Sequence, residues 1–132
     1  MVMLDTLFEK ASETRKNAYA PYSSFNVGAA ILTPSGHIYV GANVENVSYP
    51  CGMCAESGAI SAMIAAGEYQ IADILIVADS KNLISPCGAC LQRIAEFADD
   101  HTMIHLADLE GIKQSYPIAK LLPVAFAEDL KK

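Results

Sequence analysis

Two copies of the pentapeptide Pro-Cys-Gly-x-Cys, at residues 50–54 and 86–90, contain all four cysteines of the chain. Two C-x-x-C pairs are typical of a site in which four thiolates hold one metal ion as a structural staple. Such a site requires the two segments to meet in the folded chain. The question is whether all four sulfurs serve a structural site, or whether some belong to a site built for chemistry.

Size and composition argue against a purely structural metal. The 132 residues are 52% hydrophobic, which is enough for a continuous core in a single domain spanning 1–132. Four-cysteine ribbons are typical of small modules that cannot otherwise bury enough surface. A metal staple is therefore not needed for this chain to fold.

Charge and the N-terminal segment limit the partners and the compartment. The net charge is −6 and the basic residues are few and scattered, which disfavours nucleic acid and favours a small uncharged substrate. Residues 1–20 mix charges into a helical pattern and lack the apolar stretch of a signal peptide, so we expect a cytoplasmic protein with reduced thiols. No apolar run approaches the roughly 18 residues of a membrane helix, so we expect no membrane partner.

Hydrophobic periodicity predicts alternating helices and strands. An amphipathic helix opens the chain and is predicted to stop near 20–24, and a turn at 34–36 separates the arms of a β-hairpin. The later elements, in chain order, are a helix within 55–67, a buried strand within 71–79, a helix within 90–98, a strand within 102–108 and a proline-punctuated tail over 116–126. Strands that alternate with helices predict a mixed sheet covered by helices on its faces.

This pattern places three cysteines at helix N-termini. Cys54 falls in the first turn of one predicted helix, and Cys87 and Cys90 fall in the first turn of the next. The free N–H groups and the positive dipole end of a helix lower the pKa of thiols placed there. Cys51 lies outside this arrangement, in the loop. It could reach a metal, but no predicted helix end places it there.

A carboxylate distinguishes the first cysteine pair from the second. Glu56 follows Cys54 by two residues, and no acid stands at the corresponding position after Cys90. Beside a zinc-bound water, a carboxylate can take the proton that the metal makes acidic and pass it on. Taken alone, Glu56 could equally be a solvated first-turn acid favoured by the helix dipole.

The combined pattern resembles that of the zinc-dependent nucleoside and base deaminases. Cys-Ala-Glu at 54–56 followed by Pro-Cys-Gly-Ala-Cys at 86–90 matches their motif, and Cys in first place is similar to the small homotetrameric cytidine deaminases. The resemblance extends through 22–30, 41–49 and 121–126. It implies a three-layer α/β/α sandwich with a mixed five-stranded sheet, assembled as a homotetramer with one zinc ion per subunit.

The resemblance also implies the reaction. Cys54, Cys87 and Cys90 would hold zinc with water as the fourth ligand. Zinc-bound hydroxide would attack C4 of cytosine while Glu56 shuttles protons and ammonia leaves. The enzyme would be a hydrolase acting on a cyclic amidine C–N bond, converting cytidine and deoxycytidine to uridine and deoxyuridine in pyrimidine salvage.

Substrate contacts are implied at further matching positions. Asn43 and Glu45 would hydrogen-bond the ribose, Phe25 would pack beside the pyrimidine, and the backbone N–H of Ala55 would recognise the base edge. Other positions would act across a subunit boundary, with Phe126 reaching a neighbour's site; these are Val47, Tyr49 and Phe126.

Two positions depart from the family pattern. Relatives with three cysteine ligands commonly place Arg directly after the Glu and again after the second cysteine pair, where this chain has Ser57 and Leu91. Three thiolates leave a zinc site with excess negative charge, which lowers the acidity of its water unless a cation offsets it. Arg93 lies three positions beyond Cys90, on nearly the same helix face, so we expect Ser57 and Arg93 to form a substitute outer layer of the site.

Other functions remain open on the residues alone. One is deamination of an aminopyrimidine nucleoside analogue such as blasticidin S. A non-catalytic alternative is a four-cysteine zinc module in which Cys51 is the fourth ligand. Editing of RNA or DNA is disfavoured by the acidic charge. The histidines are expected as surface or strand residues rather than ligands; they are His37, His101 and His105.

Overall fold

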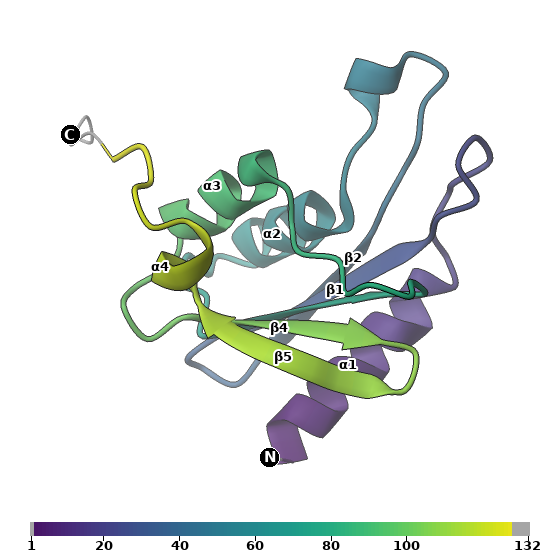
Figure 1. Cartoon of the computed structure of the whole chain (residues 1–132). Helices are drawn as coiled ribbons and strands as arrows, with labels where there is room; N and C mark the ends of the chain where they lie inside the picture. Colours follow the sequence, from purple (N-terminus) through teal and green to yellow (C-terminus); the bar gives the residue numbers. More distant parts are fainter. Residues whose placement is uncertain (1, 128–132) are drawn as a thin grey trace.

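The structure is a computed structural model that describes residues 2–127 (Figure 1). Its elements in chain order are α1 (Val2–Arg15), β1 (Val27–Leu32), β2 (Ile38–Ala42), η1 (Tyr49–Cys51), α2 (Ala55–Ala65), β3 (Asp73–Ala78), α3 (Gly88–Glu96), β4 (Met103–Asp108), β5 (Gly111–Pro117) and α4 (Ile118–Leu121). Among the described residues, no helix combines the length and the apolar character that crossing a bilayer requires.

The five strands form one mixed sheet in the order β2-β1-β3-β4-β5. β1 pairs antiparallel with both β2 and β3, and β5 pairs antiparallel with β4. β3 and β4 are parallel, and α3 supplies the crossover that a parallel pair requires. The C-terminal end of β3 therefore leads into the loop before α3.

Helices cover both faces of this sheet, as Figure 1 shows, with α1 on one side and α2 and α3 on the other. Alternate side chains of β3 pack into the two hydrophobic cores, one on each face of the sheet. Ile74 and Ile76 belong to the core beneath α2 and α3, whereas Leu75 and Val77 pack in the core beneath α1. Burial on both faces explains the continuous apolar run of β3. The predicted three-layer sandwich with a mixed five-stranded sheet is confirmed.

Gly41 lets α2 lie directly on β2. A Cβ added to Gly41 would collide with the backbone N of Ala59 and the backbone O of Ala55, so no other residue fits between strand and helix at that point. Gly58 lies across the same contact, where an added Cβ would stand 3.4 Å from Gly41 Cα. The first turns of α2 are thereby fixed against the sheet.

The structure differs from the sequence prediction at both ends of the chain. α1 ends at Arg15 rather than near 20–24, because the chain then turns and bonds to the segment after β2, with the Tyr19 N–H donating to the Asn43 carbonyl at 3.0 Å. At the other end, the predicted tail begins within β5. Hydrophobic patterning did not reveal β5, because its middle residues are polar and exposed at the sheet edge.

Candidate active site

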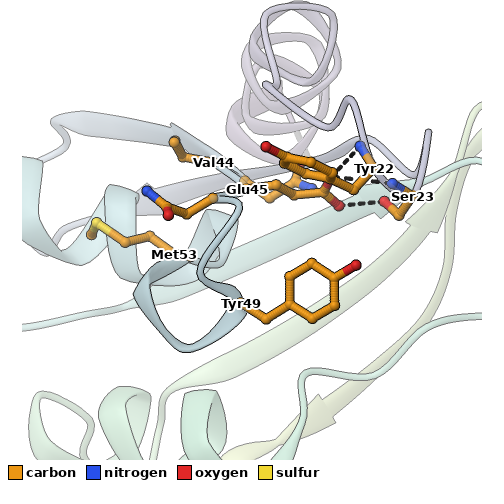
Figure 2. A pocket seen from close by; sticks show the side chains of 9 residues that line it. Tyr22, Ser23, Val44, Glu45, Tyr49 and Met53 are labelled. Carbon is orange, nitrogen blue, oxygen red and sulfur yellow. Dashed lines mark hydrogen bonds between the residues drawn. The ribbon is translucent and has the colours of Figure 1, made fainter.

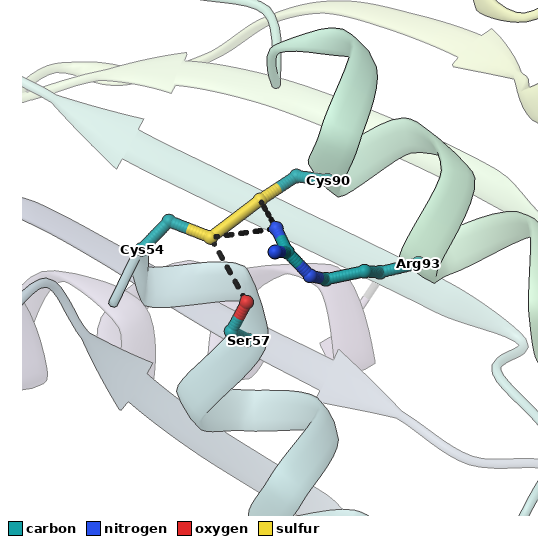
Figure 3. Close-up of a disulfide and its surroundings, with 4 residues drawn as sticks. All are labelled: Cys54, Ser57, Cys90 and Arg93. Atoms are coloured by element: carbon teal, nitrogen blue, oxygen red, sulfur yellow. Dashed lines mark hydrogen bonds between the residues drawn. A yellow bond between two sulfur atoms is a disulfide. The ribbon is translucent and has the colours of Figure 1, made fainter. Parts of the chain in front are cut away.

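The N-terminal ends of α2 and α3 bring Cys54, Glu56 and Cys90 together. One ligand atom from each, two Sγ atoms and a carboxylate oxygen, lie within 4.8 Å of one another. The two sulfurs are in direct contact and are drawn as a disulfide in Figure 3. Their Cα atoms are 7.7 Å apart, wider than the roughly 4.4–6.8 Å usual for disulfides. The backbone positions therefore fit two separate thiols at one site better than a disulfide.

Local sequence explains why these sulfurs are available. Cys54 and Cys87 are the N-cap residues of α2 and α3, and neither side chain makes a capping hydrogen bond to its own helix. Cys90 follows within the first turn of α3 and is 1% exposed. As predicted, three thiols lie at the positive ends of two helices, where thiolates are favoured.

The other two cysteines are placed differently from this pair. Cys87 lies outside the group formed by Cys54, Glu56 and Cys90, but it lines a cavity of about 590 Å³ that Cys54 also lines. Cys51 is exposed at the end of η1, where its thiol donates to Ser48 Oγ at 3.6 Å. Among the described residues, Cys51 is not one of those that line this cavity, and it is not a member of the group formed by Cys54, Glu56 and Cys90.

This donor set fits zinc. Zn²⁺ is held by thiolates in tetrahedral sites, and its catalytic sites use three protein ligands and leave one position for water. Two sulfurs meet, a third lines the adjoining cavity, and a carboxylate stands beside them. The arrangement leaves room on the cavity side for a small molecule.

Glu56 is a buried acid, only 5% exposed. Burial raises the pKa of its carboxyl above the usual value, and its own backbone N–H and the charge of Arg93 oppose that rise. A carboxyl buried beside thiols is suited to holding a proton and releasing it locally. The solvated alternative considered for Glu56 from the sequence is wrong.

Ser57 and Arg93 contact the sulfurs from the cavity side (Figure 3). Ser57 Oγ lies 3.1 Å from Cys54 Sγ. Arg93 Nη1 donates to Cys90 Sγ at 3.5 Å and to Cys54 Sγ at 3.9 Å. One guanidinium nitrogen therefore reaches both thiols of the cluster.

A second cavity, of about 440 Å³, adjoins the first (Figure 2). Gly52 and Met53 line both cavities. Tyr22 and Tyr49 meet edge to face over it, with ring centroids 6.2 Å apart. Tyr22 and Met53 were not among the predicted site residues, and the one signal for Tyr22 was its place in the matching segment 22–30.

The predicted ribose contacts, Asn43 and Glu45, both line this second cavity and also join two loops. Asn43 accepts from the Val27 N–H at 2.8 Å and donates to the Phe25 carbonyl at 2.9 Å. Its amide keeps one N–H and one lone pair for a ligand.

Glu45 accepts hydrogen bonds from Ser23 Oγ and from the N–H groups of Tyr22 (2.9 Å) and Ser23 (3.1 Å), as the dashed lines in Figure 2 show. The Ser23 hydroxyl, and then these two N–H groups, hold the pKa of Glu45 below its usual value. The carboxylate is thus ionised and fixed in place, with lone pairs remaining for a hydroxyl donor.

The remaining predicted contacts are more scattered. Ala55 is buried as the first residue of α2, and Phe25 is half-buried beside the second cavity's loops. Val47, Tyr49 and Phe126 are 78%, 76% and 74% exposed. Among the described residues that line the two cavities, Tyr49 is the one member of this exposed group.

Thiols at two helix ends beside a buried carboxylate, on an α/β/α sandwich, define a thiolate metal site next to a ligand-sized cavity. Residues 1–106 match the family described as the cytidine and deoxycytidylate deaminase zinc-binding region. The chain belongs to this family, and the predicted resemblance is confirmed.

Individual relatives match this chain over more than nine-tenths of its length. The cytidine deaminase of Halalkalibacterium halodurans is 42% identical over 125 residues, covering 94% of this chain and 95% of the relative. That of Sporosarcina psychrophila is 40% identical, with 96% and 93% covered. The crystal structure of cytidine deaminase from Burkholderia pseudomallei superposes with a TM-score of 0.87 at 40% identity, covering 92% of this chain and 98% of that one.

Proposed function

We propose that the protein is a zinc-dependent cytidine deaminase that converts cytidine and deoxycytidine to uridine and deoxyuridine with release of ammonia. The observation that carries this is the cluster of Cys54, Cys90 and buried Glu56 in a chain of this family. In this proposal residues 1–132 act as one catalytic domain in the cytoplasm, where thiols stay reduced.

Cys54, Cys87 and Cys90 would hold the zinc ion. When bound, zinc supplies a water molecule that loses its proton near neutral pH. The support is the pair of meeting sulfurs and the position of Cys87 as N-cap of α3, on the cavity shared with Cys54.

Glu56 moves the protons. It takes one from the water and delivers it to N3 of cytosine, which makes C4 more electrophilic. After the water oxygen has bonded to C4, Glu56 carries the second proton to the exocyclic nitrogen. The C4–N bond then breaks with ammonia as leaving group, and the oxygen remains as the uracil carbonyl. Burial of Glu56 keeps these protons away from bulk water.

Neighbouring groups would orient the nucleoside. The backbone N–H of Ala55, at the first position of α2, has no partner within the helix and is free for the base edge. Asn43 and Glu45 would bind the ribose through their remaining donor and acceptor sites, and Phe25 would pack beside the pyrimidine. The fixed carboxylate of Glu45 supports a role in holding a hydroxyl.

We assign Arg93 and Ser57 to charge balance at the metal. Three thiolates concentrate negative charge, and Arg93 donates to two of them. Ser57 adds a hydroxyl contact to Cys54. These side chains would take over the task of the arginines that related sites place at other positions.

A homotetramer would complete the sites. The segment between β2 and α2 carries Val47 and Tyr49, and Phe126 lies in the tail that follows β5 and α4. β2 and β5 are the two edges of the sheet. Val47, Tyr49 and Phe126 are exposed in the single chain, so they are available to a second copy. Further copies of the chain would cover them, with Phe126 entering a neighbour's site.

The test is to incubate the zinc-loaded protein with cytidine, deoxycytidine or blasticidin S and follow the ultraviolet change of deamination. We expect turnover of the first two and little of the third. If blasticidin S is turned over and neither cytidine nor deoxycytidine is, the protein is instead a deaminase of an aminopyrimidine nucleoside analogue.

Zinc content separates this function from a four-cysteine module. Cys51→Ser should keep zinc, whereas Cys87→Ser should lose most of it. Loss of zinc in Cys51→Ser would favour the module, in which Cys51 is a ligand.

A further inference from the structure

The side chain of Gln92 holds both backbone groups of Phe126. Gln92 Nε2 donates to the Phe126 carbonyl at 2.9 Å, and the Phe126 N–H donates to Gln92 Oε1 at 3.2 Å. Among the described residues, these are the hydrogen bonds that fasten segment 123–127 to the rest of the chain. One amide therefore determines where this part of the tail lies.

The two hydrogen bonds from Gln92 fix the backbone of a residue whose side chain is largely exposed. The Phe126 ring is 74% exposed and that of neighbouring Val124 is 92% exposed. Ordering a tail costs conformational entropy, and here no buried side chain compensates for that cost within the same chain. A rigidly held, exposed aromatic ring is the form of a preorganised anchor, since a partner then binds it without ordering it first.

Gln92 also ties the tail to the metal-site helix. It lies two residues after Cys90 in α3, whose N-cap is Cys87. Within one helix, distances between residues are fixed by the backbone. The place of Phe126 is therefore set relative to the same helix that positions two of the proposed zinc ligands.

We propose that Gln92 is a positioning residue for the deaminase reaction, which fixes Phe126 so that its ring is presented to the nucleoside site of a second copy of the chain. The inference rests on the proposed function, in which Phe126 completes a neighbouring site. Gln suits the task because a primary amide can donate to a carbonyl and accept from an N–H of the same residue. An ionised Glu at this position lacks the donor and would face the Phe126 carbonyl with negative charge.

The test is a double-mutant cycle on the zinc-loaded protein with Gln92→Ala, Phe126→Ala and the double variant. Gln92→Ala should raise KM for cytidine by about tenfold with kcat within about twofold, because it loosens binding rather than the proton transfers. Gln92→Glu should behave similarly. In the Phe126→Ala background, Gln92→Ala should add less than about twofold, because the two residues act as one unit.

Two further measurements keep the test interpretable. Hydrogen exchange of the Phe126 amide should accelerate by about tenfold or more in Gln92→Ala, while the amides of α3 keep their protection. Ala has a higher helix propensity than Gln, so α3 should remain folded in Gln92→Ala. Zinc content and thermal unfolding verify this. Gln70→Ala is the matched control, since that side chain bonds only locally, to the Ile71 carbonyl at 3.2 Å.

An unchanged KM in Gln92→Ala, or an effect of full size in the Phe126→Ala background, would overturn the proposal. Failure of the proposed function looks different: the zinc-loaded wild type would then neither turn over cytidine nor bind uridine in a calorimetric titration. In that case the positioning role of Gln92 in the reaction is overturned together with the proposed function.

Discussion

Arg93 places a single guanidinium nitrogen within reach of two sulfur atoms, at 3.5 Å from Cys90 and 3.9 Å from Cys54. A guanidinium carries a delocalised positive charge, so it offsets thiolate charge at the metal ligands. Its side chain is exposed, which lets solvent and salt weaken the effect. The benefit should therefore be largest at low ionic strength.

Replacing this residue gives a prediction about metal affinity. Arg93→Ala should weaken zinc binding by about 10-fold or more, within the range typical of groups that support metal ligands, and Arg93→Lys should lose less. Competition with a chromophoric chelator measures this. Lys81→Ala, which removes a positive charge from an exposed loop residue, is the control. Equal zinc affinity in Arg93→Ala and wild type would show that the contact does not balance the site.

At the scale of elements, α2 is held to the β1–β2 hairpin at both ends. Near the start of α2, the absence of a side chain at Gly41 lets the backbone of Ala55 and Ala59 lie directly against β2. Beyond its end, Glu68 accepts hydrogen bonds from Ser35 and Tyr39 of the hairpin, each at 2.5 Å. The helix that carries Glu56 is thus attached to the hairpin near its start and just beyond its end.

Two glycine substitutions test the first of these attachments. Gly41→Ala should destabilise the fold by about 2 kcal/mol or more and reduce zinc content, because its methyl group would collide with helix backbone. Gly58→Ala should be neutral or slightly stabilising, because its methyl group has ordinary contact distances and Ala favours the helix. Chemical denaturation of both variants decides this, and equal stabilities would contradict the close approach.

Glu68 tests the second attachment through pH. Hydrogen bonds from Ser35 and Tyr39 lower the pKa of Glu68 from 4.5 to about 2. Because the folded pKa lies below the unfolded one, the stabilisation is complete above pH 4.5 and is lost as pH falls towards about 2. Glu68→Gln should therefore be less stable than wild type near neutrality, with a gap that closes over this range.

Urea unfolding of wild type and Glu68→Gln at several pH values measures the gap. Glu110→Gln, an exposed acid paired with Lys113 at 3.4 Å, is the control. A gap that stays constant down to pH 2 would rule out the ionised carboxylate as its source.

Sequence reasoning succeeded where one local signal decides the structure. The apolar run of β3 and the cysteines before α2 and α3 are examples, since burial and capping position fix their places. Patterning missed β5, whose exposed polar residues are ordered by pairing with β4. It also did not reveal that Asn43 and Glu45 fasten loops, because those contacts join residues distant in sequence.

At the scale of the whole molecule, the groups proposed to complete a site lie at opposite edges of the sheet. The segment with Tyr49 follows β2 and the tail with Phe126 follows β5 (Figure 1). A closed assembly of identical chains can bring such groups together between neighbours. If the proposed homotetramer forms, light scattering should give the mass of four chains of 14.1 kDa.

Mixed assemblies test whether sites are shared. At cytidine concentrations well below KM, Phe126→Ala subunits keep Glu56 but bind the substrate weakly, and Glu56→Gln subunits keep Phe126 but turn over slowly, so each protein alone should be weakly active. Random hybrids formed in equal amounts should recover about a quarter of wild-type activity, because half the sites keep Glu56 and half of those receive an intact ring. Native mass spectrometry verifies that hybrids form, and hybrids without recovered activity would contradict a donated Phe126.

The most direct measurement of the central claim compares zinc-loaded wild type with Glu56→Gln at equal zinc content, quantifying uridine and ammonia from cytidine. We predict one ammonia per uridine for the wild type. Glu56→Gln should be slower by about 10²–10⁴-fold, because it keeps the shape of the site but cannot carry protons. A zinc-loaded wild type that forms no uridine, or a Glu56→Gln variant that matches its rate, would contradict the account.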